Sequence, residues 1–336
     1  MENVLILQGG GSLGAYECGV FKVLDEQNIK FDIVAGTSIG AVNASIISAS
    51  KYDPAKALEE FWLDIADKFT PEYLPYPFNA FYSLYISSIF GNPKVFKPRW
   101  FNPYDKWYYL YDLEPLKDTL MSYIDLNNLR NRLIITATDS VLWISVAFDS
   151  NNIRLDTDHI LACAAFPFYG IKWINKDNRY LWDGSLLSNT PLREVINASP
   201  KKSKNVYIVN LFPRVHDTIP TNLFEVWHRA MDIMHTDKTK HNVKMSRVIS
   251  KYLKVMHDMH DLLDHKNPKF AEIEEEYHRI AVDKGAIINK IVRFERMEET
   301  HYLFEDADFS ISSIKRLIER GEKDARKILK YRNDTF

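Results

Sequence analysis

Cysteine is scarce in this chain, which has only two among 336 residues, Cys18 and Cys163. A disulfide framework is therefore not expected, and a reducing compartment is favoured. Neither sign of charge is in excess, because 43 lysines and arginines oppose 45 acidic residues. This balance argues against nucleic acid as the main partner. No apolar run approaches the roughly 18 residues of a membrane-spanning helix or fits a signal peptide, so a cytoplasmic protein is expected.

Glycine is also scarce, yet four of the 12 glycines lie between residues 9 and 14, in the stretch LILQGGGSLGAYECGV. Such a cluster allows a sharp turn or the close approach of a ligand. The spacing Gly9-x-Gly11-x-x-Gly14 matches the dinucleotide fingerprint, which also needs an acidic residue at the end of the second strand. That predicted strand has Asp32 near its start and is followed by Gly36, which disfavours a dinucleotide site. No Gly-Lys-Ser/Thr follows, which excludes a phosphate-binding P-loop.

The predicted elements alternate between strands and helices. Short apolar runs predict strands, and apolar residues at helical spacing predict helices. Their alternation within the first fifty residues is typical of parallel α/β layering. We therefore predict a three-layer α/β/α fold with a mostly parallel central sheet and a helical C-terminal extension. The predicted strands cover residues 4–7, 31–35, 133–138, 143–148, 206–211 and 286–294, and the predicted helices 16–26, 41–50, 54–67, 158–165, 222–270 and 310–330.

Composition changes along the chain suggest its organisation. Residues 61–111 hold 18 of the 44 aromatic residues and six prolines, which predicts an insertion of loops and short helices. From residue 222 onward the chain is rich in both signs of charge and keeps a helical pattern. We predict one domain over residues 1–215 that carries this insertion, and a mainly helical extension over 216–336 that packs on the same domain.

The pentapeptide GTSIG follows the second predicted strand and has the pattern of a nucleophile elbow. Gly36 and Gly40 flank Ser38, and glycines leave room for the strained turn that exposes a nucleophilic serine at a helix N-terminus. The alternative is that Ser38 only caps the helix. Acyl transfer to a serine also needs backbone N–H donors for the oxyanion. The glycine-rich loop at residues 9–11 and the residue after the nucleophile, Ile39, are the candidates.

A nucleophilic serine needs a base. The chain has ten histidines, but nine lie from His216 onward and His159 begins a predicted helix, so none is favoured by its context. Asp183 is the better candidate, because it follows an apolar strand-like run and precedes Gly184 on a tight turn. The structural alternative is a common Asp-Gly turn.

Four segments, GGGSLG, GTSIG, ACAAFPFYG and WDGSLLSNTPL, stand in the order and spacing of the patatin-like phospholipases, and the sequence resembles the bacterial subgroup with a C-terminal extension. This resemblance implies a Ser-Asp dyad without a catalytic histidine, with Ser38 as the nucleophile and Asp183 as the base. It also implies that the loop of Gly9, Gly10 and Gly11 binds the oxyanion.

Two residues depart from the pattern of that family. Leu13 occupies a position where the family usually has arginine or lysine, which removes a charge beside the oxyanion loop. Ser185 follows Gly184 where glycine or alanine is usual, and this change is mild because serine is small.

Other features have simpler interpretations. The aromatic segment 61–111 is more typical of packing than of a site, and its functional interpretation is a cap with an apolar acyl groove that touches lipid surfaces. His257 and His260 share a face of a predicted helix, but a solvated polar face is favoured over a zinc site.

The sequence therefore predicts a serine hydrolase of lipid or other carboxylic esters that needs no metal or organic cofactor. Two alternatives stay open: an acyltransferase that passes the acyl group to a thiol or alcohol, and a lipid- or acyl-binding protein without turnover. The head group, the chain length and the oligomeric state are not predicted.

Overall fold

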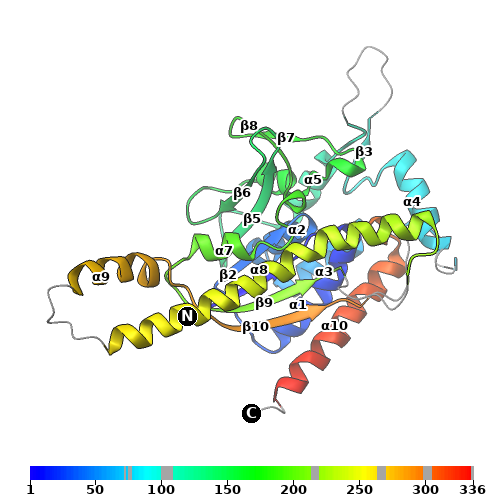
Figure 1. The fold of residues 1–336 in the computed structure, drawn as a ribbon. Helices are drawn as coiled ribbons and strands as arrows, with labels where there is room; N and C mark the ends of the chain where they lie inside the picture. The colour runs from blue at the N-terminus through cyan, green and yellow to red at the C-terminus, as the bar shows by residue number, and fades with distance from the viewer. Residues whose placement is uncertain are drawn as a thin grey trace.

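The computed structural model describes residues 1–71, 73–74, 78–99, 109–212, 219–262, 270–297 and 305–333. Its centre is an eight-stranded sheet with the order β10-β9-β1-β2-β5-β8-β7, and β6 pairs with β5 off this path (Figure 1). The strands are β1 (Glu2–Leu7), β2 (Ile33–Thr37), β5 (Arg132–Asp139), β6 (Ile144–Asp149), β7 (Ile174–Lys176), β8 (Arg179–Asp183), β9 (Lys204–Asn210) and β10 (Ile288–Glu295). Two short strands, β3 (Lys97–Pro98) and β4 (Tyr111–Asp112), pair separately.

The helices flank this sheet on both faces (Figure 1). They are α1 (Ala15–Glu26), α2 (Ile39–Ala49), α3 (Pro54–Ile65), α4 (Phe78–Phe90), α5 (Glu114–Tyr123), α6 (Thr157–Ala164), α7 (Leu192–Ala198), α8 (Leu223–Asp261), α9 (Phe270–Tyr277) and α10 (Ile311–Asn333). Short helical turns are η1 (Gly11–Gly14), η2 (Pro167–Tyr169), η3 (Gly184–Leu186), η4 (His278–Val282) and η5 (Glu305–Ala307).

The five strands from β10 to β5 run parallel, and the strands at the other edge run antiparallel. Leu7 at the end of β1 lies opposite Gly36 in β2, so the loops that follow these two strands meet at one edge of the sheet. Ligands bind at this carboxyl edge in open α/β sheets. The antiparallel strand β8 brings Asp183 to the same region, opposite Ala137 of β5.

Side chains that alternate along β1 enter two separate cores. Leu5 and Leu7 pack in the core under α1, α2, α3 and α10, whereas Val4 and Ile6 pack in the core under α7 and α8. Successive residues of a strand point to opposite faces, so a fully apolar strand needs cover on both sides. The predicted three-layer α/β fold with a mostly parallel sheet and C-terminal helices is confirmed.

The described part of the segment after residue 216 is built into this core. Strand β10 extends the sheet beside β9, and α10 crosses α1 in close contact, since a Cβ placed on Gly321 would lie 2.1 Å from the Tyr16 carbonyl oxygen. The boundary predicted at residue 215 and residues 263–269 of the predicted helix 222–270 lie outside the described residues. The division into two domains stays a prediction.

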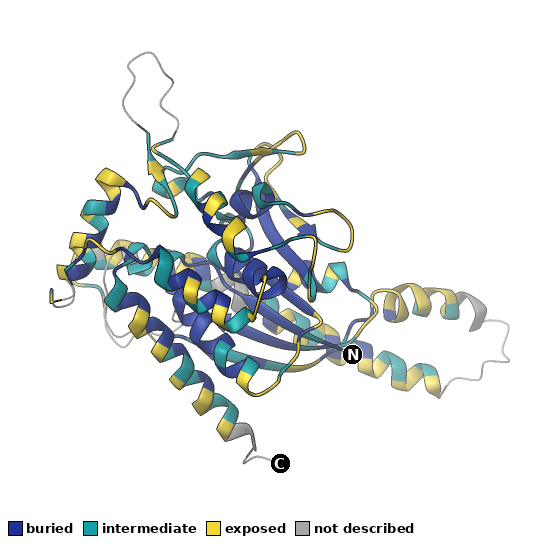
Figure 2. Cartoon of the chain, turned by 180° about the vertical axis from the view of Figure 1, so that it is seen from behind, coloured by how far each residue is buried: buried dark blue, intermediate teal, exposed yellow. Residues whose placement is uncertain are grey.

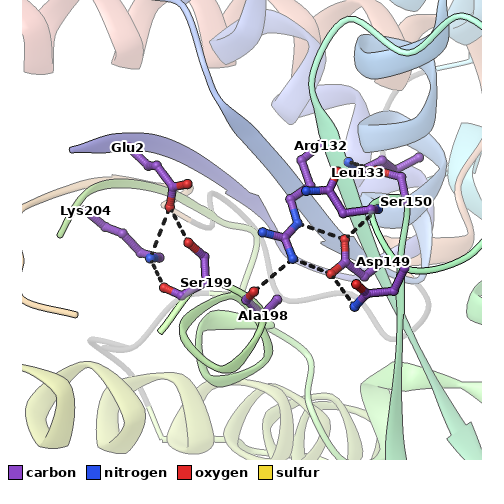
Figure 3. A network of polar contacts seen from close by, with 10 residues as sticks. Glu2, Arg132, Leu133, Asp149, Ser150, Ala198, Ser199 and Lys204 are labelled. Atoms are coloured by element: carbon purple, nitrogen blue, oxygen red, sulfur yellow. Dashed lines mark hydrogen bonds and ion pairs between the residues drawn. The ribbon is translucent and has the colours of Figure 1, made fainter. Parts of the chain in front are cut away.

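A buried polar network lies at the amino ends of the parallel strands (Figure 3). Lys204 at the start of β9 is fully buried, and its ammonium lies 3.2 Å from the Glu2 carboxylate. Burial lowers the pKa of Lys204. Arg132 at the start of β5 donates to Asp149, with 2.8 Å between Nε and Oδ1. These charges occupy the edge of the sheet opposite to Ser38, so they do not enter the candidate site.

Candidate active site

Ser38 stands at a strained turn between β2 and α2. Its backbone has φ 56° and ψ −129°, a conformation that residues other than glycine rarely adopt. The turn requires the two flanking glycines, because a Cβ on Gly36 would lie 2.0 Å from the Gly40 carbonyl oxygen and one on Gly40 would lie 2.5 Å from that of Leu7. Backbone strain of this kind clusters at functional sites. The turn holds the half-buried Ser38 at the positive end of α2.

The glycine-rich loop after β1 lies against this serine. A Cβ on Gly9 would lie 2.8 Å from the Ser38 Cβ, so only glycine permits this approach. Asn189 fixes the position of Gly9: its carbonyl oxygen accepts the Gly9 N–H, and its side-chain amide donates to the Gly9 carbonyl oxygen, both at 3.3 Å. The N–H groups of Gly10 and Gly11 donate to no residue within the described ranges. Gly9 therefore supplies space, while the other two retain free donors.

Asp183 ends β8 and is fully buried. Its Oδ1 accepts the backbone N–H of Ser185 at 2.8 Å. Burial raises the pKa of Asp183 to about 6, and the approach of the Ser38 hydroxyl is the largest influence that opposes this rise. The two side chains form no full hydrogen bond, and Oδ2 of Asp183 has no partner among the described residues. A Cβ on Gly184 would lie 2.4 Å from the Thr136 carbonyl oxygen, so glycine is needed at that turn as well.

A mostly apolar cavity of about 510 Å³ opens beside Ser38. Its floor contains the glycine loop, Ser38 and Ile39. Much of its wall comes from the aromatic segment 61–111, from the last residue of α6 and from the turn that follows it. These lining residues are Phe61, Ile65, Leu84, Ser87, Ser88, Val95, Phe96, Leu110, Tyr111, Ala164, Phe166, Pro167, Phe168, Tyr169, Gly170 and Ile171. Within the described part of 61–111, the aromatic insertion thus forms a wall of the cavity as well as packing on the core.

A model of the patatin-like phospholipase family matches residues 5–196, which is more than half of the chain. The chain belongs to the patatin-like phospholipase family. The match includes Ser38, Asp183 and the glycine-rich loop.

Two individual proteins are similar to this patatin-like chain. Over 42 residues it is 50% identical to a lysophospholipase, nte1, of Aspergillus terreus, and this stretch is 12% of the chain and 3% of that protein. The crystal structure of VipD from Legionella pneumophila superposes with a TM-score of 0.41 and 13% identity, over 98% of this chain and 67% of that one.

The C-terminal segment completes one wall of the patatin-like site. In η5, the Glu305 carbonyl oxygen accepts the Ser12 hydroxyl at 3.1 Å, and Asp306 accepts the Tyr169 hydroxyl at 2.6 Å. The Glu305 carboxylate in turn pairs with buried Arg296 at 2.9 Å. Gly11, with φ 54°, fits beneath η5 because a Cβ there would lie 2.1 Å from the Asp306 carbonyl oxygen. The glycine-rich loop is therefore held from the C-terminal side.

Leu13 is buried in the main core with 1% of its surface exposed. The position at which we expected a departure from the family pattern is thus an ordinary packing position in this chain. Leucine at position 13 gives the glycine-rich loop no charged neighbour there. The contacts described above hold the loop against η5.

Two residues of the site were not predicted from the sequence. His235 of α8 lines the cavity, stacks on Phe212 with 4.8 Å between ring centres, and donates from Nδ1 to the Met231 carbonyl oxygen at 2.8 Å. Asn189, which fixes Gly9, lies within the quoted WDGSLLSNTPL segment but carried no assigned role. Sequence context did not single out His235 as a neighbour of Ser38, because it is one of many polar residues in the long helix α8.

The histidine pair considered for zinc makes ordinary polar contacts. His257 contacts the Tyr277 hydroxyl at 2.5 Å, and His260 pairs with Glu274 at 2.9 Å. In the described portions of the chain, no group of three ligating side chains forms a metal site. The same portions contain no helix that is both long and apolar enough to span a bilayer.

Proposed function

We propose that this chain hydrolyses lipid esters with Ser38 as the nucleophile and Asp183 as the general base. The observation that carries the proposal is the approach of a strained serine to a buried carboxyl whose Oδ2 has no other described partner. A base with a pKa of about 6 is ionised at neutral pH and still accepts a proton readily. Membership of the patatin-like family and an apolar cavity beside the serine support a lipid ester as the substrate.

In the first half of the reaction, the Asp183 carboxylate takes the proton from the Ser38 hydroxyl while Oγ bonds to the ester carbonyl carbon. The carbonyl electrons move onto oxygen, and the N–H groups of Gly10, Gly11 and Ile39 stabilise that oxyanion together with the N-terminus of α2. The tetrahedral species then breaks its bond to the alcohol oxygen, which takes the proton from Asp183. The alcohol leaves, and the acyl group stays bonded to Ser38.

In the second half, Asp183 takes a proton from a water molecule whose oxygen attacks the acyl carbon. The bond to Ser38 Oγ breaks, Oγ recovers the proton, and the fatty acid leaves as the second product. The cavity holds the acyl chain against its apolar wall during both halves. Asp183 gives or takes the proton in every transfer.

The test is a screen of the purified full chain against p-nitrophenyl esters of graded chain length. We expect turnover to rise with acyl length until the cavity is filled, and Ser38→Ala to abolish it. A fluorophosphonate probe should label Ser38, as found by mass spectrometry. Absence of both turnover and labelling in a folded protein would refute the proposal and leave lipid binding. Acyl transfer to an added thiol or alcohol in preference to water would identify an acyltransferase.

A further inference from the structure

Helix α4 is built with its polar face inside and its apolar face outside. Asn79, Ser83 and Ser87 recur at intervals of four residues and are the buried positions. By contrast, Phe78 and Tyr85 expose 64% and 63% of their surface. A surface helix of a water-facing protein normally shows the reverse pattern. Figure 2 shows exposed residues along α4 at the margin of the molecule.

The buried face of α4 is held by polar contacts. The Asn79 amide donates to the hydroxyl groups of Ser310 and Ser312 at 3.3 and 3.1 Å, which joins α4 to the start of α10. At the other end, the Tyr111 hydroxyl donates to the Ser88 carbonyl oxygen at 2.8 Å. The orientation of the helix is therefore fixed by specific hydrogen bonds, and its aromatic side is directed outward.

The same helix also lines the cavity beside Ser38, through Leu84, Ser87 and Ser88. Leu110 and Phe168 line that cavity and are themselves exposed, so they mark its mouth. A molecule that covers the outer face of α4 is thus separated from the cavity by one helix. The outer face of α4 therefore lies next to the mouth of the cavity. This favours a lipid surface over a protein as the partner of that face, because a lipid in that surface could pass its acyl chain into the cavity.

We propose that α4 docks the protein on a zwitterionic phospholipid surface and so delivers substrate to the cavity, an inference that rests on the proposed function. The helix has 13 residues and spans about 20 Å, too short to cross a bilayer but suited to lie in the interface. Phenylalanine and tyrosine rings are favoured at that depth. Because α4 contains no charged residue, binding depends on apolar contact and changes little with salt.

The experiment measures binding of the full chain to phosphatidylcholine vesicles by flotation. The test variant is Phe78→Ser with Tyr85→Ser, since neither residue lines the cavity. The matched control is Tyr252→Ser with Met259→Ser, which expose 66% and 61% of their surface. Both belong to the carboxyl-terminal part of α8, which lies far from α4 (Figure 1). We expect the α4 variant to lower the vesicle partition coefficient at least about tenfold per ring, and the α8 variant to leave it unchanged.

The α4 variant should hydrolyse a dissolved short-chain ester as fast as the unmodified protein, while its hydrolysis of vesicle phospholipid falls with binding. Unchanged vesicle binding of the α4 variant, or no binding by the unmodified protein, overturns the docking proposal. So does conversion of a dimer to a monomer by the variant in light scattering, which would make α4 a subunit contact. Ser38→Ala separates the two proposals, because it should bind vesicles normally whether or not the chain is a hydrolase.

Discussion

Replacing Asp183 by asparagine should make the protein more stable and nearly inactive at the same time. The buried carboxyl has its pKa raised from 3.8 to about 6. The folded protein therefore binds its proton more tightly than the unfolded chain does, and stability is lost as pH rises between these two values. At 1.36 kcal/mol per pKa unit, the ionised carboxylate costs the folded state about 3 kcal/mol at neutral pH.

Asparagine has nearly the same shape and no charge, so Asp183→Asn removes this cost. Its Oδ1 keeps the acceptor for the Ser185 N–H, and its amide occupies the site of the unpartnered Oδ2. We expect the free energy of unfolding to rise by about 3 kcal/mol at pH 7.5 and by about half as much at pH 5. Ester turnover should fall by at least about 10²-fold, because the variant has no base for Ser38.

The assay is urea unfolding at the two pH values, with turnover of a short-chain ester on the same preparations. Asp149→Asn is the matched control, since it also neutralises a buried aspartate but leaves Arg132 without its partner. That variant should lose stability. The reasoning is refuted if Asp183→Asn lowers stability at pH 7.5, or if it retains near-normal turnover.

The remaining predictions test the pH dependence and the glycine loop. The value of kcat/KM should fall about tenfold per pH unit below an apparent pKa of about 6, because protonated Asp183 accepts no proton. If the residual activity of Asp183→Asn shows the same fall at acid pH, the titrating group is another residue. Gly11→Ala should slow labelling by a fluorophosphonate by about 10²-fold or more, because its Cβ would displace the Asp306 carbonyl and move the oxyanion donors. Leu13→Arg should lower the melting temperature without raising turnover, since it buries a charge in the core; a faster enzyme of unchanged stability would contradict this.

Local pattern was sufficient for most central strands and for the turn that carries Ser38. Apolar runs that end in glycine predicted β1 and β2, and the glycines around Ser38 predicted the strained turn that the structure contains. Asp183 was predicted from a turn and from family resemblance, because no local pattern shows that a residue 145 positions further along the chain comes close to Ser38.

The rest of the site depends on contacts between distant segments. From the sequence, Gly9, Gly10 and Gly11 are equivalent candidates for oxyanion donors. The structure shows that the Gly9 N–H already donates to the Asn189 carbonyl oxygen. Likewise, the sequence predicted only an insertion of loops and short helices over 61–111. The contacts of Asn79 with the start of α10 show which face of α4 is directed inward. Such features arise from packing between segments more than 100 residues apart, which hydrophobic periodicity does not encode.

The support of the glycine loop by η5 has a consequence for the timing of activity during synthesis. A ribosome that has just added Ser38 still has to add 268 residues to reach Asp306. At about 5–20 residues per second this takes roughly 13 seconds or more. Throughout that interval the nascent chain carries its serine without the wall that holds Gly11 in place. Under the function that we propose, the oxyanion loop is therefore complete only after η5 has been made, near the end of synthesis.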